Sequence, residues 1–140
     1  MMMLARDVSR VLGLENSVLW SDLERRVQVG LPKGSAKRVF VHVFPRPGEA
    51  MEWVYRIIPR ASYKRRRGAL SPAESERVGR FARVIAAAER VFDDQAAARR
   101  FLVTPHDLLD GKTPIEAAMT EIGAVRVEEL LMRAVYGIPV

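Results

Sequence analysis

The sequence predicts an all-α protein, and three observations support that prediction. Apolar residues recur at three- and four-residue spacing along residues 74–92, as one face of a helix requires. Ser71 and Pro72 precede this stripe with the chemistry of a helix start: a capping hydroxyl, then a proline that needs no N–H. The most strand-like stretch, residues 39–44, has no partner strand elsewhere in the chain.

Composition sets the broad class. The chain has 140 residues, 49% of them hydrophobic, which suits one ordinary domain or two small ones that share a core. It has no cysteine, which excludes thiol catalysis, disulfides and thiolate metal sites. No apolar run is long enough to span a membrane, and no cleavable leader is visible. A cytoplasmic protein without membrane association is therefore expected.

The charge is unevenly distributed. The net charge is +6, but residues 1–72 hold 14 Lys/Arg against 6 Asp/Glu, whereas residues 73–140 hold 9 against 11. A basic half followed by a slightly acidic half suggests two tasks, the first with a polyanionic partner. The alternative is that the arginines only cover solvated faces.

The first helices are predicted from breaks and apolar spacing. Residues 2–12 form a short amphipathic helix that Gly13 ends, and Ser21 is expected to cap a helix over residues 22–27. Residues 35–44 carry both a strand-like composition and a helical stripe. The missing partner strand favours the helix.

Three consecutive elements resemble a helix-turn-helix unit in length and spacing: residues 35–44, 49–58 and 59–67, with a break at residues 45–48. In such a unit the last helix enters the major groove of DNA. The candidate DNA-binding residues on it are Arg60, Ser62, Lys64, Arg65, Arg66 and Arg67. A flexible basic turn is the alternative, and Trp53 and Tyr63 are expected to pack rather than to stack on bases.

The second half is predicted to be a run of short helices. Glu74 completes a capping box with Ser71, and the helix that begins there ends near Phe92. Asp93 is then expected to cap a helix that runs to about Leu102.

Two Thr-Pro steps, at Thr104 and Thr113, are each expected to cap a short helix, with an Asp-Gly turn at residues 110–111 between them. Gly123 is expected to close one short helix. The last helix is amphipathic and ends at Gly137. This stretch shows no catalytic set and is interpreted as a binding surface.

Enzymatic chemistry has little support. His42 and His106 are far apart in sequence and lack a metal-ligand spacing, so each is expected to form a local or core hydrogen bond. Asp93-Asp94 is interpreted as a helix cap, and the adjacent carboxylates of Glu128 and Glu129 point to different sides of a helix. No phosphate-binding glycine loop or nucleophile elbow is present, and neither a metal nor a cofactor is expected.

From Leu70 to the C-terminus the chain resembles a known family. Its segments LSPAESERVGRFARVIAAAERVF, DDQAAARRFLVTP and LLDGKTPIEAAMTEIGAVRVEELLMRAVYGI are similar to the C-terminal toxin-binding domain of Xre/MbcA/ParS-type antitoxins. PRASYKRRRG lies where that family carries the end of its helix-turn-helix, whereas the segments VFVHVF and PRPG depart from the family pattern. The resemblance implies a helix-turn-helix and dimerisation region at residues 1–69 and a toxin-binding domain at residues 70–140.

The resemblance also implies partners. They would be a RES-domain toxin that degrades NAD⁺ and operator DNA of the chain's own operon. A second copy of the chain is also expected, because helix-turn-helix proteins commonly bind two half-sites. The family's motif residues here are Thr104, Pro105, Gly111, Thr113, Pro114, Glu121, Gly123, Glu128, Leu131, Arg133, Tyr136 and Gly137. Those expected to touch the toxin are Glu128, Arg133, Tyr136, Ile138, Pro139 and Val140. The alternative function is a DNA-binding transcription regulator without a toxin.

Overall fold

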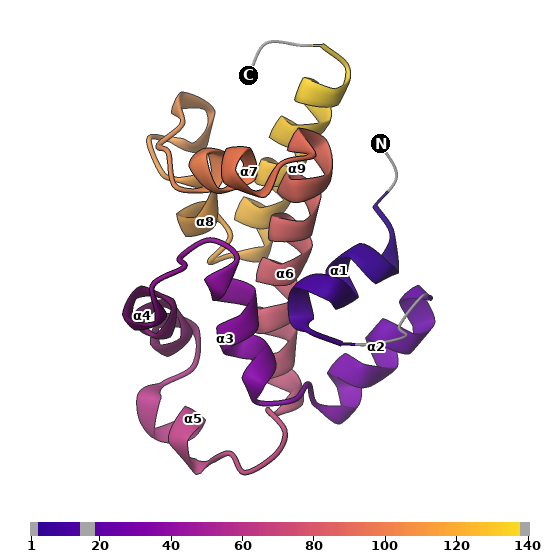
Figure 1. Cartoon of the computed structure of the whole chain (residues 1–140), viewed down its shortest axis with the longest axis vertical. Helices are drawn as coiled ribbons and strands as arrows, with labels where there is room; N and C mark the ends of the chain where they lie inside the picture. Colours follow the sequence, from indigo (N-terminus) through magenta and orange to yellow (C-terminus); the bar gives the residue numbers. More distant parts are fainter. Residues whose placement is uncertain (1–2, 15–18, 138–140) are drawn as a thin grey trace.

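The computed structural model describes residues 3–14 and 19–137, whose regular structure is helical (Figure 1). In order, the helices are α1 (Ala5–Leu12), α2 (Trp20–Val29), α3 (Gly34–Val41), α4 (Pro47–Ile57), α5 (Arg60–Arg65), α6 (Pro72–Phe92), α7 (Gln95–Leu102), the 3₁₀ helix η1 (Asp107–Leu109), α8 (Pro114–Ala117) and α9 (Glu121–Val135). The only β-pairing among these described residues is an isolated bridge between Pro32 and Ala69. The predicted all-α class is confirmed.

Helix α6 is the axis of the molecule. It begins as predicted: Ser71 Oγ accepts from Glu74 N at 3.1 Å, and Glu74 Oε1 accepts from Ser71 N at 2.8 Å. Helices α1, α2, α3, α7 and α9 all pack along it (Figure 1). Helix α1 reaches its last turns, where Asp7 lies 3.2 Å from Arg90. Its predicted core stripe is fully buried: Val78, Phe81, Ala82, Ile85 and Ala88. Because these side chains meet helices from both halves, one continuous core joins the halves.

The segment with strand-like composition, residues 39–44, is helical as far as Val41, where α3 ends. Residues 42–44 form the turn that follows, so the helix predicted to end at Phe44 is three residues shorter. Val39 and Phe40 of α3 are completely buried, and the Phe40 ring lies 5.0 Å from that of Phe81 on α6. Trp53 of α4 stacks on Phe44 with ring centroids 5.5 Å apart, so its predicted packing role is confirmed. The composition of this segment fits either a helix or a strand. Its burial against α6 is what selects the helix.

Two of the predicted caps near the helix ends need correction. Helix α2 begins at Trp20 after Leu19, without a side-chain cap, so Ser21 is not its N-cap. Asp93 instead ends α6 in the left-handed conformation, at φ 50°, and Asp94 caps α7 by accepting from Ala96 N at 3.1 Å. Gly13 ends α1 at φ 74°, as predicted.

The Thr-Pro steps behave differently from one another. Thr113 Oγ1 accepts from Glu116 N at 3.1 Å and caps α8, as predicted. Thr104 caps no helix: its hydroxyl donates to the Arg100 carbonyl at the end of α7. The cap of η1 is His106, whose Nδ1 accepts from Leu108 N at 3.1 Å, so the local bond predicted for this histidine is confirmed.

Gly123 does not close a helix. It lies in the first turn of α9, where Thr120 Oγ1 accepts from its N–H at 2.9 Å. A Cβ at this position would lie 1.8 Å from the Ala117 carbonyl oxygen. The glycine therefore lets the end of α8 approach the backbone of α9 closely. In the sequence alone, a glycine required for such close packing cannot be distinguished from a glycine that ends a helix.

Candidate functional site

Helices α4 and α5 form the tight pair expected of a helix-turn-helix. Ile58 and Pro59 are the only residues between them, and both have extended backbone. The Pro59 carbonyl accepts from Tyr63 N at 2.9 Å and so starts α5. Tyr63 packs edge-on against Tyr55 of α4, with ring centroids 5.9 Å apart, which fixes the angle between the two helices.

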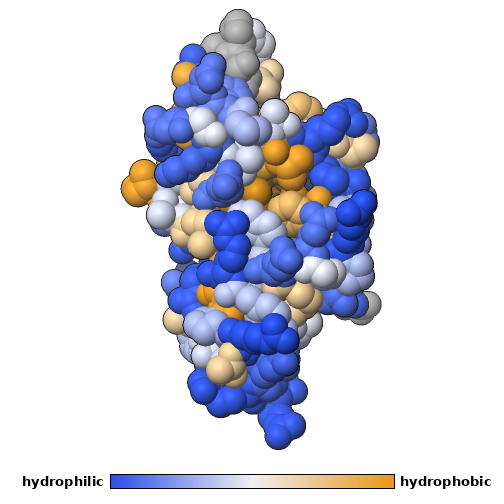
Figure 2. Space-filling model, turned by 90° about the vertical axis from the view of Figure 1, so that its left-hand side faces the viewer, coloured by the Kyte–Doolittle hydropathy of each residue, from blue (hydrophilic) through white to orange (hydrophobic). Residues whose placement is uncertain are grey.

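The predicted DNA-binding residues divide into two groups. Arg60, Lys64, Arg65 and Arg67 are exposed on α5 or just after it. Ser62 is half-buried and accepts from Arg65 Nη2 at 3.5 Å. The lower end of the molecule, to which α5 belongs, is almost entirely hydrophilic in Figure 2. The exposed cations therefore form a surface suited to phosphate oxygens and guanine edges.

Arg66 is the exception. Its Nε and Nη2 donate to the two carboxylate oxygens of Glu74, at 2.8 and 3.2 Å, so its guanidinium faces α6. Burial raises the pKa of Glu74, but the hydrogen bonds from Arg66 and Ser71 outweigh burial and hold this pKa below its ordinary value. Arg66 thus fastens the segment after α5 to the start of α6.

A second surface lies on α9. Ile122, Val125 and Tyr136 are 72%, 40% and 69% exposed, and they follow one another along one side of the helix together with Arg133. The opposite side carries the buried Val127, Leu130 and Leu131. Large apolar side chains in water on one helix face are typical of an interaction surface, and arginine and tyrosine are common anchors in such surfaces.

The 3₁₀ helix η1 extends this surface. Arg126 Nη1 lies 2.9 Å from Asp110 Oδ2, and Arg126 Nη2 donates to the Leu108 carbonyl at 2.8 Å. These bonds fasten the loop at Leu108 to the edge of α9. Leu108, whose side chain is 49% exposed, therefore lies beside the exposed face. The name "α9 face" is used below for Leu108, Ile122, Val125, Arg133 and Tyr136.

Of the residues predicted to touch the toxin, Arg133 and Tyr136 lie on this face, whereas Glu128 lies on another side of α9. Its two carboxylate oxygens accept from Arg83 Nε at 3.2 and 3.0 Å. Ile138, Pro139 and Val140 lie outside the described residues. Sequence reasoning missed Ile122 and Val125, although their position off the buried stripe of α9 was the signal that could have found them.

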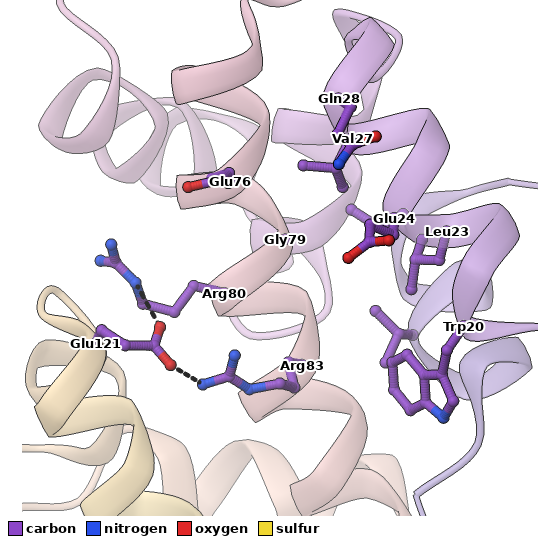
Figure 3. A pocket seen from close by; sticks show the side chains of 12 residues that line it. Trp20, Leu23, Glu24, Val27, Gln28, Glu76, Gly79, Arg80, Arg83 and Glu121 are labelled. Atoms are coloured by element: carbon purple, nitrogen blue, oxygen red, sulfur yellow. Dashed lines mark hydrogen bonds and ion pairs between the residues drawn. The ribbon is translucent and has the colours of Figure 1, made fainter.

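A groove of about 400 Å³ separates α2 from α6 and the start of α9 (Figure 3). Trp20 and Leu23 line its apolar wall. On the other wall Glu121 pairs with Arg83 at 2.8 Å and with Arg80 at 3.5 Å. The described lining contains no histidine, serine or threonine, and its carboxylates belong to Glu24, Glu76 and Glu121.

Neither metal ligation nor membrane insertion finds a structural basis in the part of the chain described. Residues 3–14 and 19–137 bring no group of three or more His, Asp or Glu side chains together as metal ligands. Within the same ranges, no helix has the length and hydropathy needed to cross a bilayer.

Comparison with known proteins matches both surfaces to described domains. Residues 22–83, which include α4 and α5, match the family model for the "Antitoxin Xre-like helix-turn-helix domain". Residues 87–137, which include η1 and α9, match the model for the "Antitoxin Xre/MbcA/ParS C-terminal toxin-binding domain". The two matched ranges thus correspond to two kinds of domain that both occur in antitoxins.

Two curated relatives agree with these matches. The chain is 37% identical over 68 residues to "Antitoxin Xre" of Pseudomonas putida, which covers 49% of this chain and 43% of that protein. It is 39% identical over 85 residues to "Antitoxin Xre" of Yersinia enterocolitica, which covers 58% of this chain and 57% of that protein. The chain thus spans about half the length of the curated relatives it matches. It belongs to the Xre/MbcA/ParS antitoxin family.

Proposed function

We propose that this chain neutralises a partner toxin by binding it through the α9 face, and that it binds operator DNA through α5. The observation that carries the proposal is the exposure of Ile122, Val125 and Tyr136 on one side of a helix inside the matched toxin-binding region. Burial of such side chains by a partner would remove apolar surface from water, which is the main favourable term in protein association.

The partner we propose is a RES-domain toxin that degrades NAD⁺, with the chain obstructing the toxin's NAD⁺ site. The resemblance of residues 70–138 to antitoxins of that kind supports this identity. In this scheme the antitoxin is not an enzyme, acts in the cytoplasm where its toxin and its operator are, and represses its own operon as a homodimer. Helix-turn-helix proteins commonly bind two half-sites as dimers.

The test is co-expression with the product of the adjacent gene, with cell growth and NAD⁺ level as readouts. The adjacent gene alone should stop growth and deplete NAD⁺, and this chain should restore both. The double substitution Ile122→Asp with Tyr136→Ala should abolish the rescue, because a charge placed in the interface stays desolvated and unpaired. A harmless neighbour, or rescue by the double variant, would contradict the proposal.

The second candidate is a transcription regulator without a toxin, and the exposed cations of α5 favour it as much as they favour an antitoxin. A harmless neighbour combined with salt-dependent binding to upstream DNA would identify this function. The α9 face would then need a different partner.

A further inference from the structure

Helix α3, the element that precedes the α4–α5 pair, carries a second basic surface, separate from the cations of α5. Lys37 and Arg38 follow Gly34 by three and four residues, and Val41 follows Gly34 by seven, so all of them lie on one side of the helix. They line a hollow of about 510 Å³, to which Arg10 of α1 adds a third cation. None of the described residues that line the hollow is Asp or Glu.

Lys37 and Arg38 are available to a ligand. Both are exposed, and neither forms an ion pair within the described part of the chain. Arg10 is partly neutralised by Asp7, whose carboxylate lies 3.7 Å away. His42, at the far end of the hollow, is occupied by Glu89 at 2.8 Å. Among the described residues, the hollow therefore offers mainly two positive charges without an ion-pair partner, those of Lys37 and Arg38.

The position of Arg38 is fixed by the backbone below it. A Cβ at Gly13 would lie 2.2 Å from Arg38 Cδ and 2.9 Å from its Nη1, so the side chain of Arg38 lies directly over this glycine. The glycine, at φ 74°, ends α1 in the left-handed conformation. An arginine whose stem is packed in this way loses less rotamer entropy when it binds an anion than a free surface arginine does.

The start of α3 adds to the positive potential. Its N-cap, Lys33, has no side-chain capping bond, and the first turn has no acidic residue. Nothing lies within 4 Å of where a Cβ of Gly34 would be, so the backbone at this end is open to a ligand. The positive end of the helix dipole is therefore compensated neither by a capping side chain nor by an acidic residue in the first turn.

The hollow is continuous with α5. Tyr63 of α5 is one of its lining residues, and Lys33 lies over the Tyr63 ring at 4.6 Å while its Nζ donates to the Arg66 carbonyl at 3.1 Å. Helix α3 has eight residues and is about 12 Å long. Duplex DNA rises 3.4 Å per base pair, so this length corresponds to three or four base pairs of backbone.

We propose that Lys37 and Arg38 bind phosphates of the DNA backbone beside the site that α5 contacts. The proposal rests on the proposed operator binding and extends it: α5 would contact the bases, and α3 would fix the orientation of the protein on the duplex. Phosphate contacts of this kind carry no sequence information and contribute uniformly to affinity.

The test measures fluorescence anisotropy of a labelled operator duplex against the full chain at several salt concentrations. The double variant K37Q/R38Q should weaken binding to operator and to unrelated duplex by the same factor. It should lower the slope of log K against log salt by about 2, one unit for each lost phosphate contact. K112Q/R100Q, which also removes one lysine and one arginine from exposed positions, is the matched control and should leave the slope unchanged.

A second comparison separates this proposal from operator binding itself. K64Q/R65Q on α5 should weaken operator binding. It should also reduce the ratio of the affinity for operator to the affinity for unrelated duplex. If K64Q/R65Q weakens DNA binding while K37Q/R38Q behaves like the unaltered protein, the assignment of α3 is wrong and operator binding stands. If the unaltered protein neutralises its toxin but binds no duplex at low salt, both DNA proposals fail and the antitoxin function stands.

A free phosphate compound is the other source of the same chemistry. Pyrophosphate, titrated against the full chain without DNA, should bind only weakly, in the millimolar range or above, because two cations alone give little affinity in water. Submillimolar binding of pyrophosphate that K37Q/R38Q abolishes, combined with unchanged DNA binding, would assign the hollow to a small phosphorylated ligand and overturn the proposal.

Discussion

Arg83 of α6 and Glu128 of α9 are joined by two hydrogen bonds, with Nε 3.2 and 3.0 Å from the two carboxylate oxygens. Arg83 Nη2 also donates to Glu121 Oε1 at 2.8 Å, at the start of the same helix. One guanidinium therefore fastens both the first and the second turn of α9 to the central helix. This position gives α9 a fixed orientation from which its opposite side faces solvent.

Substitution of Arg83 by Gln should lower the free energy of unfolding by about 1–2 kcal/mol, because two carboxylates lose their common partner. Chemical denaturation measures the change. Arg25→Gln is the control: its pair with Asp22 spans 3.5 Å, and the Arg25 side chain is 70% exposed. This control should change stability by less than about 0.5 kcal/mol. If both substitutions changed the free energy of unfolding equally, the contacts of Arg83 would contribute no more than an ordinary surface ion pair.

The pair between Arg66 and Glu74 predicts a dependence of stability on pH. The pKa of Glu74 is lower in the folded chain than its ordinary value of 4.5. An unfolded chain therefore binds this proton first as pH falls, so the stabilisation is complete above about pH 4.5 and is lost as pH falls through the folded pKa. Glu74→Gln should be less stable than the unaltered chain at neutral pH, by about 2 kcal/mol.

The difference between Glu74→Gln and the unaltered chain should shrink as pH falls through the folded pKa of Glu74, since both chains then carry a neutral group at this position. Urea denaturation between pH 3 and pH 7 measures it. Parallel stability curves over the whole range would contradict the assignment of the acid-sensitive contribution to this carboxylate.

The basic run that includes Arg66 shows which features of the site can be predicted from the sequence and which cannot. The run of cations after α5 is visible in the sequence, and Lys64, Arg65 and Arg67 are exposed as expected for a polyanion site. The partner of Arg66 is eight residues away on another helix, so no local rule separates this arginine from its neighbours. Side-chain pairing between elements is a tertiary property.

Sequence rules predicted correctly the features that depend only on neighbouring residues. The capping box of Ser71 and Glu74 and the cap at Thr113 need only a few adjacent residues, and both formed as predicted. Gly123 was misinterpreted because its role depends on the approach of Ala117 from the preceding helix. The face of Ile122 could have been derived from the helical period alone, as the residues off a buried stripe.

Gly123→Ala should destabilise the fold strongly, by roughly 2–4 kcal/mol, because the new methyl group would lie 1.8 Å from the backbone oxygen of Ala117. Gly79→Ala in the middle of α6 is the matched control. Its methyl group would meet only Val27 Cγ2, at 3.9 Å, and alanine favours a helix interior by about 1 kcal/mol over glycine. Thermal denaturation should therefore give a lower Tm for the first variant and an equal or higher Tm for the second. The same sign for both would contradict the close approach of α8 and α9.

Substitutions on the α9 face should weaken toxin binding without changing the stability of the fold. Ile122→Ser should change the free energy of unfolding by less than about 0.5 kcal/mol, because the side chain is 72% exposed. It should weaken the complex with the toxin encoded beside it at least tenfold, about 1.4 kcal/mol, since an apolar anchor is lost from the interface. Val29→Ser matches it in chemistry and in exposure, at 75%, but lies on α2. Calorimetric titration of both variants with toxin should show weakened binding only for Ile122→Ser. A loss of affinity for Val29→Ser alone would place the toxin against the end of α2 instead of against α9.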